Sequence, residues 1–201
     1  FNRIFMQYKT FKIRVLIVLC LFFLLFHQLG AQEKKMSQII PEPVDITPGN
    51  GTFILDKSVV VVFDTSDSLL HNSARLFLNT VERSTGLRLQ VQKKRVKQKS
   101  ILLILNSTVN PVFGNEGYVM EISSNTVKIE ANYPAGIFYG LQSLLQLFPA
   151  QIESKELVKN IEWNIPCMKI SDYPRFSWRG LMLDVSRHFF PLDLIRRNLD
   201  A

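Results

Sequence analysis

The chain has 201 residues, of which 47% are hydrophobic and 20% are charged, a composition that fits a globular protein and excludes a disordered one. The formal net charge of +7 suggests a nucleic-acid-binding protein, but four basic residues and no acidic residue precede position 32, so more than half of the excess lies in the first segment. A chain of this length accommodates one ordinary domain and part of another.

The first segment has the layout of a secretory signal peptide, which we assign to residues 1–31. Basic side chains precede an unbroken apolar run at 15–26, and the small Ala31 comes just before a polar run. A membrane span needs about 18 or more apolar residues, so an uncleaved anchor is the weaker alternative. We therefore expect an exported protein, periplasmic or secreted, with no stable membrane span after signal cleavage. Cys20 leaves with the signal, and Cys167 is then expected to be a small buried residue without a disulfide partner.

Short runs of β-branched and aromatic residues, separated by turn-forming residues, follow the signal. The prolines at 41 and 43 favour an extended start, and the Gly-Asn-Gly sequence at 49–51 predicts a turn. The runs predict strands at 52–55, 59–63, 87–91, 101–105, 118–122 and 127–131. The last two flank Ser-Ser-Asn and are predicted to form a hairpin.

Two segments carry apolar residues at helical spacing. The first covers 70–81, with capping residues at 64–67 before it and Gly86 at its end. The second covers 137–148, after Pro134, and Pro149 ends it. The order of strands and helices predicts an α+β domain with an antiparallel-rich sheet and two helices on one face.

The character of the chain changes after residue 150. Residues 151–172 are interpreted as a connection with a short strand near 157–163. Residues 176–186 predict a new strand, and 191–199 predict the start of a helix with proline at its first position. A strand followed by a helix is the repeating unit of an α/β barrel, which needs about 250 residues. We therefore expect the first β/α unit of a truncated TIM barrel.

Two sequence stretches carry a resemblance to a known family. Residues 172–191 read DYPRFSWRGLMLDVSRHFFP, and residues 135–147 read AGIFYGLQSLLQL. The first resembles the opening of the catalytic barrel in family 20 glycoside hydrolases, with Tyr-Pro, Arg-Gly and Asp-Val-Ser-Arg-His in order. The second resembles the helix that ends the accessory domain of that family. After the signal peptide at 1–31, the resemblance implies an accessory α+β domain at 32–165 and the start of a (β/α)8 barrel at 166–201.

The resemblance also implies an activity. Family 20 enzymes are exo-acting β-N-acetylhexosaminidases, which remove terminal β-linked N-acetylglucosamine or N-acetylgalactosamine from glycans. They retain the anomeric configuration because the substrate's own acetamido oxygen attacks the anomeric carbon. An adjacent Asp-Glu pair orients the acetamido group and protonates the leaving oxygen. This chain contains no adjacent Asp-Glu pair, so we expect no catalytic residue in it, no cofactor, and no activity of the fragment by itself.

One residue that contacts substrate in the family has a counterpart here. Arg179 matches the arginine that binds the C3 and C4 hydroxyls of the terminal sugar, a task that suits a planar guanidinium with several fixed donors. An arginine paired with a carboxylate inside the barrel is the alternative. Asp184, Arg187 and His188 follow in the same motif. They either line the pocket or, as we favour, form an ion-pair network at the barrel mouth.

Two interpretations compete with the enzyme: a basic nucleic-acid or membrane-surface protein, and a stand-alone module. The basic cluster at 93–99 lies between two strands and is more consistent with a solvated loop than with a phosphate-binding patch, so we expect no nucleic-acid partner. The histidines and cysteines lack metal-ligand spacing, so we expect no metal. The alternative to an enzyme is a stand-alone, non-catalytic accessory or interaction module. Such a module should end near residue 150 or 165, because a lone barrel strand would leave a large apolar patch exposed.

Overall fold

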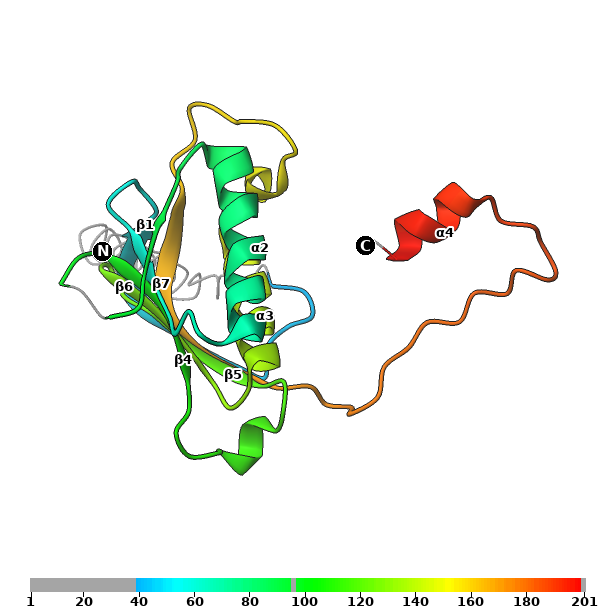
Figure 1. Ribbon diagram of the computed structural model, residues 1–201, viewed down its shortest axis with the longest axis horizontal. Coiled ribbons are helices and arrows are strands. Elements are labelled where there is room, and N and C mark those ends of the chain that lie inside the picture. The colour runs from blue at the N-terminus through cyan, green and yellow to red at the C-terminus, as the bar shows by residue number, and fades with distance from the viewer. Residues whose placement is uncertain (1–38, 95–96, 200–201) are drawn as a thin grey trace, which may run out of the picture. The chain divides into compact units, whose positions relative to one another are not determined.

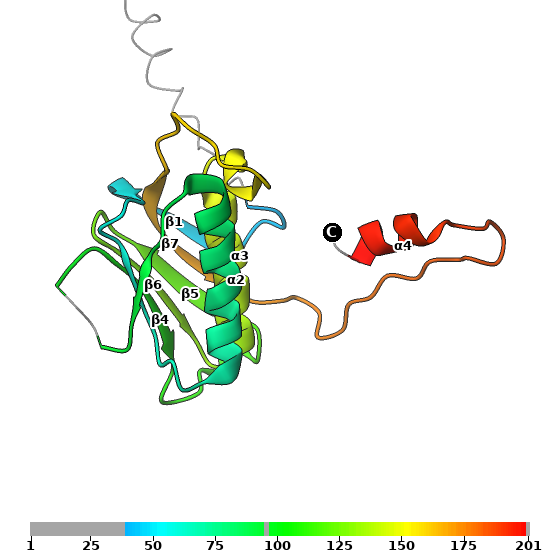
Figure 2. The ribbon, with the colours of Figure 1, turned by 45° about the horizontal axis from the view of Figure 1, so that its top comes forward.

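A computed structural model describes residues 39–94 and 97–199 of the chain. The signal peptide expected at 1–31 lies outside these residues. The described part forms a seven-stranded sheet in the order β1-β7-β5-β6-β4-β2-β3, and helices α2 and α3 both lie on one face of it (Figures 1 and 2). The strands are β1 (Asp45–Ile54), β2 (Val60–Val62), β3 (Gln90–Gln92), β4 (Ser100–Leu105), β5 (Tyr118–Ile122), β6 (Thr126–Ala131) and β7 (Asn164–Asp172). The longer helices are α2 (Ser68–Thr85) and α3 (Pro134–Leu147), and the short helical segments are η1 (Pro111–Phe113), η2 (Ala150–Glu153) and α4 (Leu192–Leu199).

Both long helices confirm the sequence prediction, including their ends. The Asp67 carboxylate accepts a hydrogen bond from the Leu70 N–H at 2.9 Å and caps the start of α2. Gly86 ends that helix in the left-handed conformation, with φ of 74°. Pro134 occupies the first turn of α3, where its missing N–H has no helical partner to lose. The apolar faces of both helices pack onto the sheet and bury Phe77, Leu141 and their neighbours.

The sheet is mixed, whereas we expected an antiparallel-rich one. Among the described strands, β1 and β7, β7 and β5, and β5 and β6 pair antiparallel, while β6 and β4, β4 and β2, and β2 and β3 pair parallel. Helix α2 links β2 to β3 and supplies the crossover that a parallel neighbour requires. Strand composition indicates where a strand lies but not the direction of its neighbour, so the prediction was wrong on this point.

Strand β7 was not predicted from the sequence, although it lies inside the sheet. It pairs with β1 on one side and β5 on the other, with Ile170 opposite both Ile46 and Met120. The prediction of a short strand near 157–163 is wrong, because those residues form irregular structure. The sheet therefore includes residues 166–172, which the sequence analysis assigned to the barrel region. Pro166, Cys167 and Lys169 interrupt a simple apolar alternation, which concealed the strand.

The expected turn at 49–51 is instead an irregularity within β1. The register of β1 against β7 shifts between Pro48 and Thr52, so the extra residues bulge while the strand continues. Gly51 has φ of 97°, a conformation that favours glycine. Cys167 lies next to this bulge and is buried, as expected, with a free thiol. The residue pattern at 49–51 thus marked a real break in regular geometry but not a chain reversal.

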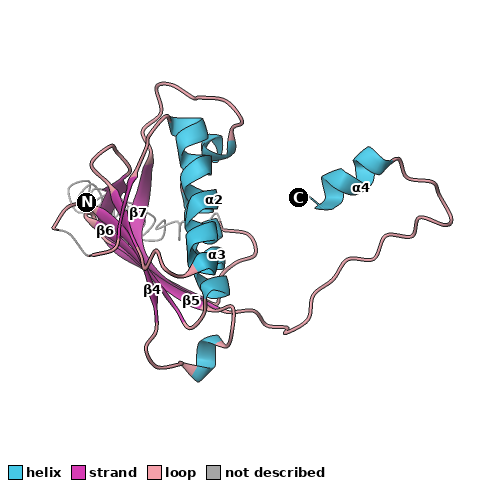
Figure 3. Ribbon diagram, viewed as in Figure 1, coloured by secondary structure: helices cyan, strands magenta, loops and turns pink. Residues whose placement is uncertain are grey.

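Between β7 and α4 the chain has no regular secondary structure (Figure 3). The strand expected at 176–186 is therefore not formed, while the helix expected at 191–199 is present as α4. A strand needs a neighbour to bond its backbone N–H and C=O groups. Within the described residues, no strand lies beside this segment. The barrel unit implied by the resemblance remains a prediction.

Candidate functional site

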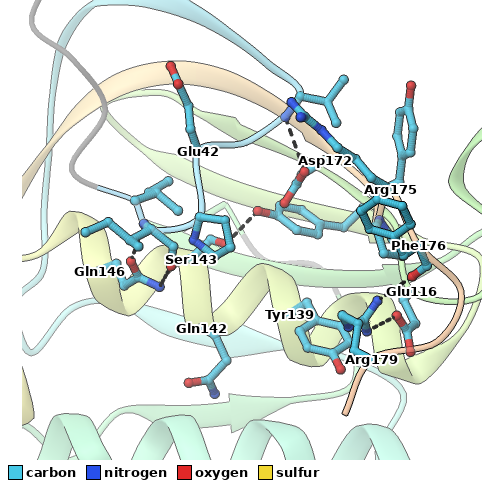
Figure 4. A pocket seen from close by; sticks show the side chains of 17 residues that line it. Glu42, Glu116, Tyr139, Gln142, Ser143, Gln146, Asp172, Arg175, Phe176 and Arg179 are labelled. Atoms are coloured by element: carbon cyan, nitrogen blue, oxygen red, sulfur yellow. Dashed lines mark hydrogen bonds and ion pairs between the residues drawn. The ribbon is translucent and has the colours of Figure 1, made fainter. Parts of the chain in front are cut away.

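A cavity of about 650 Å³ lies beside α3, and it holds the one substrate-contact residue that the sequence predicted (Figure 4). Four parts of the chain form its wall: the extended start before β1, the start of β5 with the loop before it, the cavity-facing side of α3, and the end of β7 with the residues that follow it. Its polar lining residues are Glu42, Glu116, Tyr118, Tyr139, Gln142, Ser143, Gln146, Asp172, Tyr173, Arg175 and Arg179. A volume of this size is typical of sites for small organic ligands.

The extended start is held on α3 by a pair of hydrogen bonds. The Ile40 N–H donates to Gln146 Oε1 at 2.8 Å, and Gln146 Nε2 donates to the Ile40 carbonyl oxygen at 3.2 Å. The side-chain amide thus pairs with the backbone as a neighbouring strand would. These bonds join residues 106 positions apart, so they close one side of the cavity through tertiary contact.

A buried hydroxyl pair lies at the base of the cavity. Tyr118 on β5 and Ser143 on α3 are joined by a hydrogen bond of 2.6 Å between their hydroxyl oxygens. Burial raises the pKa of the Tyr118 hydroxyl to about 12, although the bond to Ser143 partly opposes the shift. The tyrosine therefore stays neutral at physiological pH and acts as a fixed hydrogen-bonding group of the wall.

Asp172 ends β7 at the edge of the cavity. Its Oδ1 accepts a hydrogen bond from the Val44 N–H at 3.2 Å. Burial raises the pKa of its carboxyl group above the ordinary 3.8, and the backbone hydrogen bonds and Arg175 only partly offset that effect. The folded protein therefore holds a proton on Asp172 more tightly than the unfolded chain does.

This shift predicts a pH-dependent effect of Asp172→Asn. A raised carboxyl pKa stabilises the folded state at low pH, and this contribution is lost as the pH rises through the folded-state pKa. Asparagine keeps an acceptor for Val44 but carries no charge. We expect the variant to gain free energy of unfolding relative to the parent at pH 7 and to lose that gain at pH 3. Urea unfolding at both pH values measures the difference, and an advantage that is larger at pH 3 would contradict the assignment.

Arg179 is held by contacts with the sheet domain. Its Nη2 forms an ion pair with Glu116 Oε2, and its Nη1 donates to the Phe176 carbonyl oxygen at 3.0 Å. The guanidinium also lies over the Tyr139 ring, 6.0 Å from the centroid. The Glu116 hydrogen bond, followed by that of Tyr139, raises the pKa of Arg179 above its ordinary value. The side chain is therefore charged at every pH of interest.

Asp184, Arg187 and His188 do not line this cavity. Asp184 and Arg187 form an ion pair of 2.8 Å between Oδ2 and Nε, and Asp184 Oδ1 also accepts from the Ser186 and Arg187 N–H groups. His188 is exposed. The structure thus brings together two of the three residues, in a local contact that is open to solvent.

The loop that carries Glu116 is organised by a buried side chain that sequence analysis missed. Asn132 lies just after β6, and its Nδ2 donates to the carbonyl oxygens of Asn110 at 2.7 Å and Gly114 at 2.9 Å. Its Oδ1 accepts from Asn106 Nδ2 and from the Asn110 N–H, both at 2.9 Å. These four bonds use the whole hydrogen-bonding capacity of an amide. No local pattern marks Asn132 or Glu116, because their partners come from distant parts of the sequence.

We expect Asn132→Asp to destabilise the fold although the side chain keeps its shape. A carboxylate cannot donate the two hydrogen bonds that Asn132 Nδ2 makes. Its negatively charged oxygen would instead face the carbonyl oxygens of Asn110 and Gly114 and repel them. The loss should be about 1–2 kcal/mol, since water can reach part of this loop and replace some bonds. Chemical denaturation at pH 7 measures it. Asn115→Asp is the matched control, because Asn115 is exposed in the same loop. Equal losses in both variants would mean that the Asn132 network contributes nothing specific.

No group of three or more His, Cys, Asp or Glu side chains in residues 39–94 and 97–199 has the arrangement of a metal site. In the same part of the chain, no helix combines the length and the apolar character that crossing a bilayer requires.

Comparison with known proteins connects this arrangement to one family. Residues 36–173 match the family description "Glycosyl hydrolase family 20, domain 2", and residues 176–201 match "Glycosyl hydrolase family 20, catalytic domain". The chain is 32% identical over 166 residues to a β-hexosaminidase of Porphyromonas gingivalis, covering 83% of this chain and 21% of the relative. It is 28% identical to a β-N-acetylhexosaminidase of Cellulomonas fimi, covering 77% of this chain and 30% of that protein. The chain therefore spans less than a third of the length of these relatives.

Solved structures give the same relationship. The β-N-acetylhexosaminidase of Streptomyces coelicolor superposes with a TM-score of 0.70 at 31% identity, over 82% of this chain and 32% of the other. A mutant β-hexosaminidase of Streptomyces plicatus in complex with its product, N-acetylglucosamine, superposes with a TM-score of 0.67 at 27% identity, over 85% and 33%. Sequence and structure comparisons thus agree on the fold of the described domain.

Proposed function

Because the chain belongs to glycosyl hydrolase family 20, we propose that it is part of an exo-acting β-N-acetylhexosaminidase that removes terminal β-linked N-acetylglucosamine or N-acetylgalactosamine from glycans. The observation that carries this proposal is the succession of two family regions on one chain, domain 2 at 36–173 and the beginning of the catalytic domain at 176–201. The relatives named β-hexosaminidase and the product-bound neighbour support the same substrate class.

In this proposal the complete protein hydrolyses its substrate with retention and without an enzyme nucleophile. The acetamido oxygen of the terminal sugar attacks the anomeric carbon as the glycosidic bond breaks, and water then opens the cyclic intermediate. An acidic pair must polarise the acetamido group and protonate the leaving oxygen. This chain contains no adjacent Asp-Glu pair, so we propose that its 201 residues alone are inactive.

Arg179 is the substrate-binding residue that we propose for this chain. A guanidinium has five N–H donors in a rigid plane. Glu116 and the Phe176 carbonyl oxygen each accept from one of its terminal nitrogens, so further N–H groups stay available for sugar hydroxyls. Their planar arrangement suits two vicinal hydroxyls, such as those at C3 and C4 of a terminal hexosamine.

The residues that follow β7 are proposed as the start of the (β/α)8 barrel, because β7 itself lies inside the sheet, although the sequence analysis had placed the boundary at residue 166. The sheet domain before them is proposed as the accessory domain, and 1–31 as an export signal. Asp184 and Arg187 form an ion pair. This contact is consistent with the proposal that they stabilise the barrel mouth, with His188 beside them in the sequence. Three large apolar side chains of this segment are almost fully exposed: 82% for Trp178, 93% for Met182 and 91% for Phe189. The interior of a barrel would bury side chains of this kind. That exposure weighs against a stand-alone interaction module.

Hydrolysis of 4-nitrophenyl β-N-acetylglucosaminide by the complete gene product tests the proposal, with proton NMR of the first sugar released. We expect the β anomer to form first. An α anomer, or no hydrolysis by the complete product, would overturn the proposed activity. The 201-residue chain, assayed in parallel, should show no turnover. Turnover that follows the purified chain through chromatography would show that the catalytic acids have been misassigned.

A further inference from the structure

Strand β3 forms an open edge of the sheet. Within residues 39–94 and 97–199, β2 is its only neighbouring strand. The Phe63 N–H donates to the Gln92 carbonyl oxygen at 3.1 Å, so the backbone groups of Gln92 face β2. Because these groups alternate in direction along a strand, the N–H and C=O of Val91 point away from the sheet. They are free to pair with an additional strand.

A groove of about 270 Å³ runs between this edge and α2. Its floor is apolar, and the Val91 side chain, 40% exposed, contributes to it. The helix lines the opposite side with residues one turn apart. The lining residues are Phe63, His71, Arg75, Leu78, Asn79, Glu82, Leu87, Arg88, Leu89 and Val91. An open strand edge beside a groove that receives alternate side chains is the geometry of β-strand addition, in which a peptide extends a sheet.

The charges around the groove indicate which peptides could bind there. Glu82 is neutralised by an ion pair with Arg88, and Asp64, at the end of β2, is paired with Lys93 at 3.1 Å. Arg75 forms no ion pair within the described residues, and Lys94, just beyond β3, forms none there either. Of the charged residues that line the groove, Arg75 is thus the one left without an opposite charge, and it favours an acidic side chain on a partner.

We propose that the β3 edge and the groove beside it bind an extended acidic peptide segment of another protein. The peptide adds a strand next to β3 and exchanges backbone hydrogen bonds with Val91. On the face of the added strand that meets α2, apolar side chains enter the groove beside Val91 and a carboxylate lies near Arg75. A second copy of β3 is a poor partner, because two edges with the same unbalanced cations repel each other.

The test uses the full 201-residue chain and the blocked hexapeptide Val-Thr-Glu-Thr-Val-Thr, whose valines and glutamate share one face of a strand. The neutral probe carries glutamine in place of the glutamate. We expect the acidic peptide to slow hydrogen exchange of the Val91 amide about tenfold at saturation. Binding should weaken about tenfold in Arg75→Glu, because a carboxylate then faces the peptide's glutamate. Lys155→Glu, an exposed change outside the groove, is the matched control and should leave binding unchanged.

A second variant tests the backbone contact itself. Val91→Pro removes the outward N–H while the bonds of β3 to β2 use other residues, and an edge strand tolerates proline there. We expect Val91→Pro to abolish peptide binding and Val91→Ala to retain it, with circular dichroism confirming the fold of both. Binding that survives in Val91→Pro, equal binding of the neutral peptide, or self-association of the chain in place of peptide binding would each overturn the proposal.

Discussion

Replacing Arg179 by lysine in the complete enzyme is expected to lower kcat/KM about 100-fold. Lysine keeps the charge but loses the planar set of donors, so at least one charged hydrogen bond to the sugar is lost in the transition state. A hydrogen bond to a charged group contributes about 1.5–3 kcal/mol, and each 1.4 kcal/mol is about a factor of ten. Arg179→Ala should lose more, about 1,000-fold. Steady-state kinetics with a chromogenic N-acetylhexosaminide measures both.

A substrate without the C4 hydroxyl separates sugar recognition from a structural effect. The parent enzyme should discriminate against the deoxy substrate, whereas Arg179→Lys should discriminate much less, because the donor is already missing. Arg175→Lys is the control, since Arg175 lines the same cavity but lies outside the Arg-Gly motif. Unchanged kinetics in Arg179→Lys, or the same loss in Arg175→Lys, would rule out the role that we propose.

Gly140→Ala is expected to destabilise the sheet domain by about 2–3 kcal/mol. In an isolated helix the same change would stabilise by about 1 kcal/mol, because alanine is the better helix former. Here α3 lies so close to the sheet that a Cβ on Gly140 would be 2.6 Å from Ile129 Cγ2 and 3.2 Å from the Tyr118 ring. Both neighbours are fully buried side chains of the core, so neither can move without cost.

A double-mutant cycle tests whether close packing is the cause. Ile129→Ala removes the nearest atom, and Gly140→Ala should cost much less in that background. Urea denaturation of the parent, both single variants and the double variant gives the coupling energy. A penalty that is the same in both backgrounds would place the effect elsewhere, for example in the backbone of α3.

Part of the candidate site could be predicted from sequence because its signals are local. Arg179 was found through a continuous motif, and the two glycines of α3 lie in another. Glu116, Tyr139 and Asn132 were not found. Glu116 is 63 positions from Arg179. The sequence around an isolated acidic residue in a loop does not indicate which basic residue it pairs with.

The sequence alone determined the two long helices with their caps, the β5–β6 hairpin and the family, since each depends on residue types a few positions apart. Only the tertiary structure decided that β7 lies between β1 and β5, that half of the strand pairings are parallel, and that Glu116 and Tyr139 hold Arg179. The physical reason is the range of the interactions. Helical periodicity and capping act within a turn or two of the chain, whereas strand order and ion-pair partners depend on which distant surfaces bury each other.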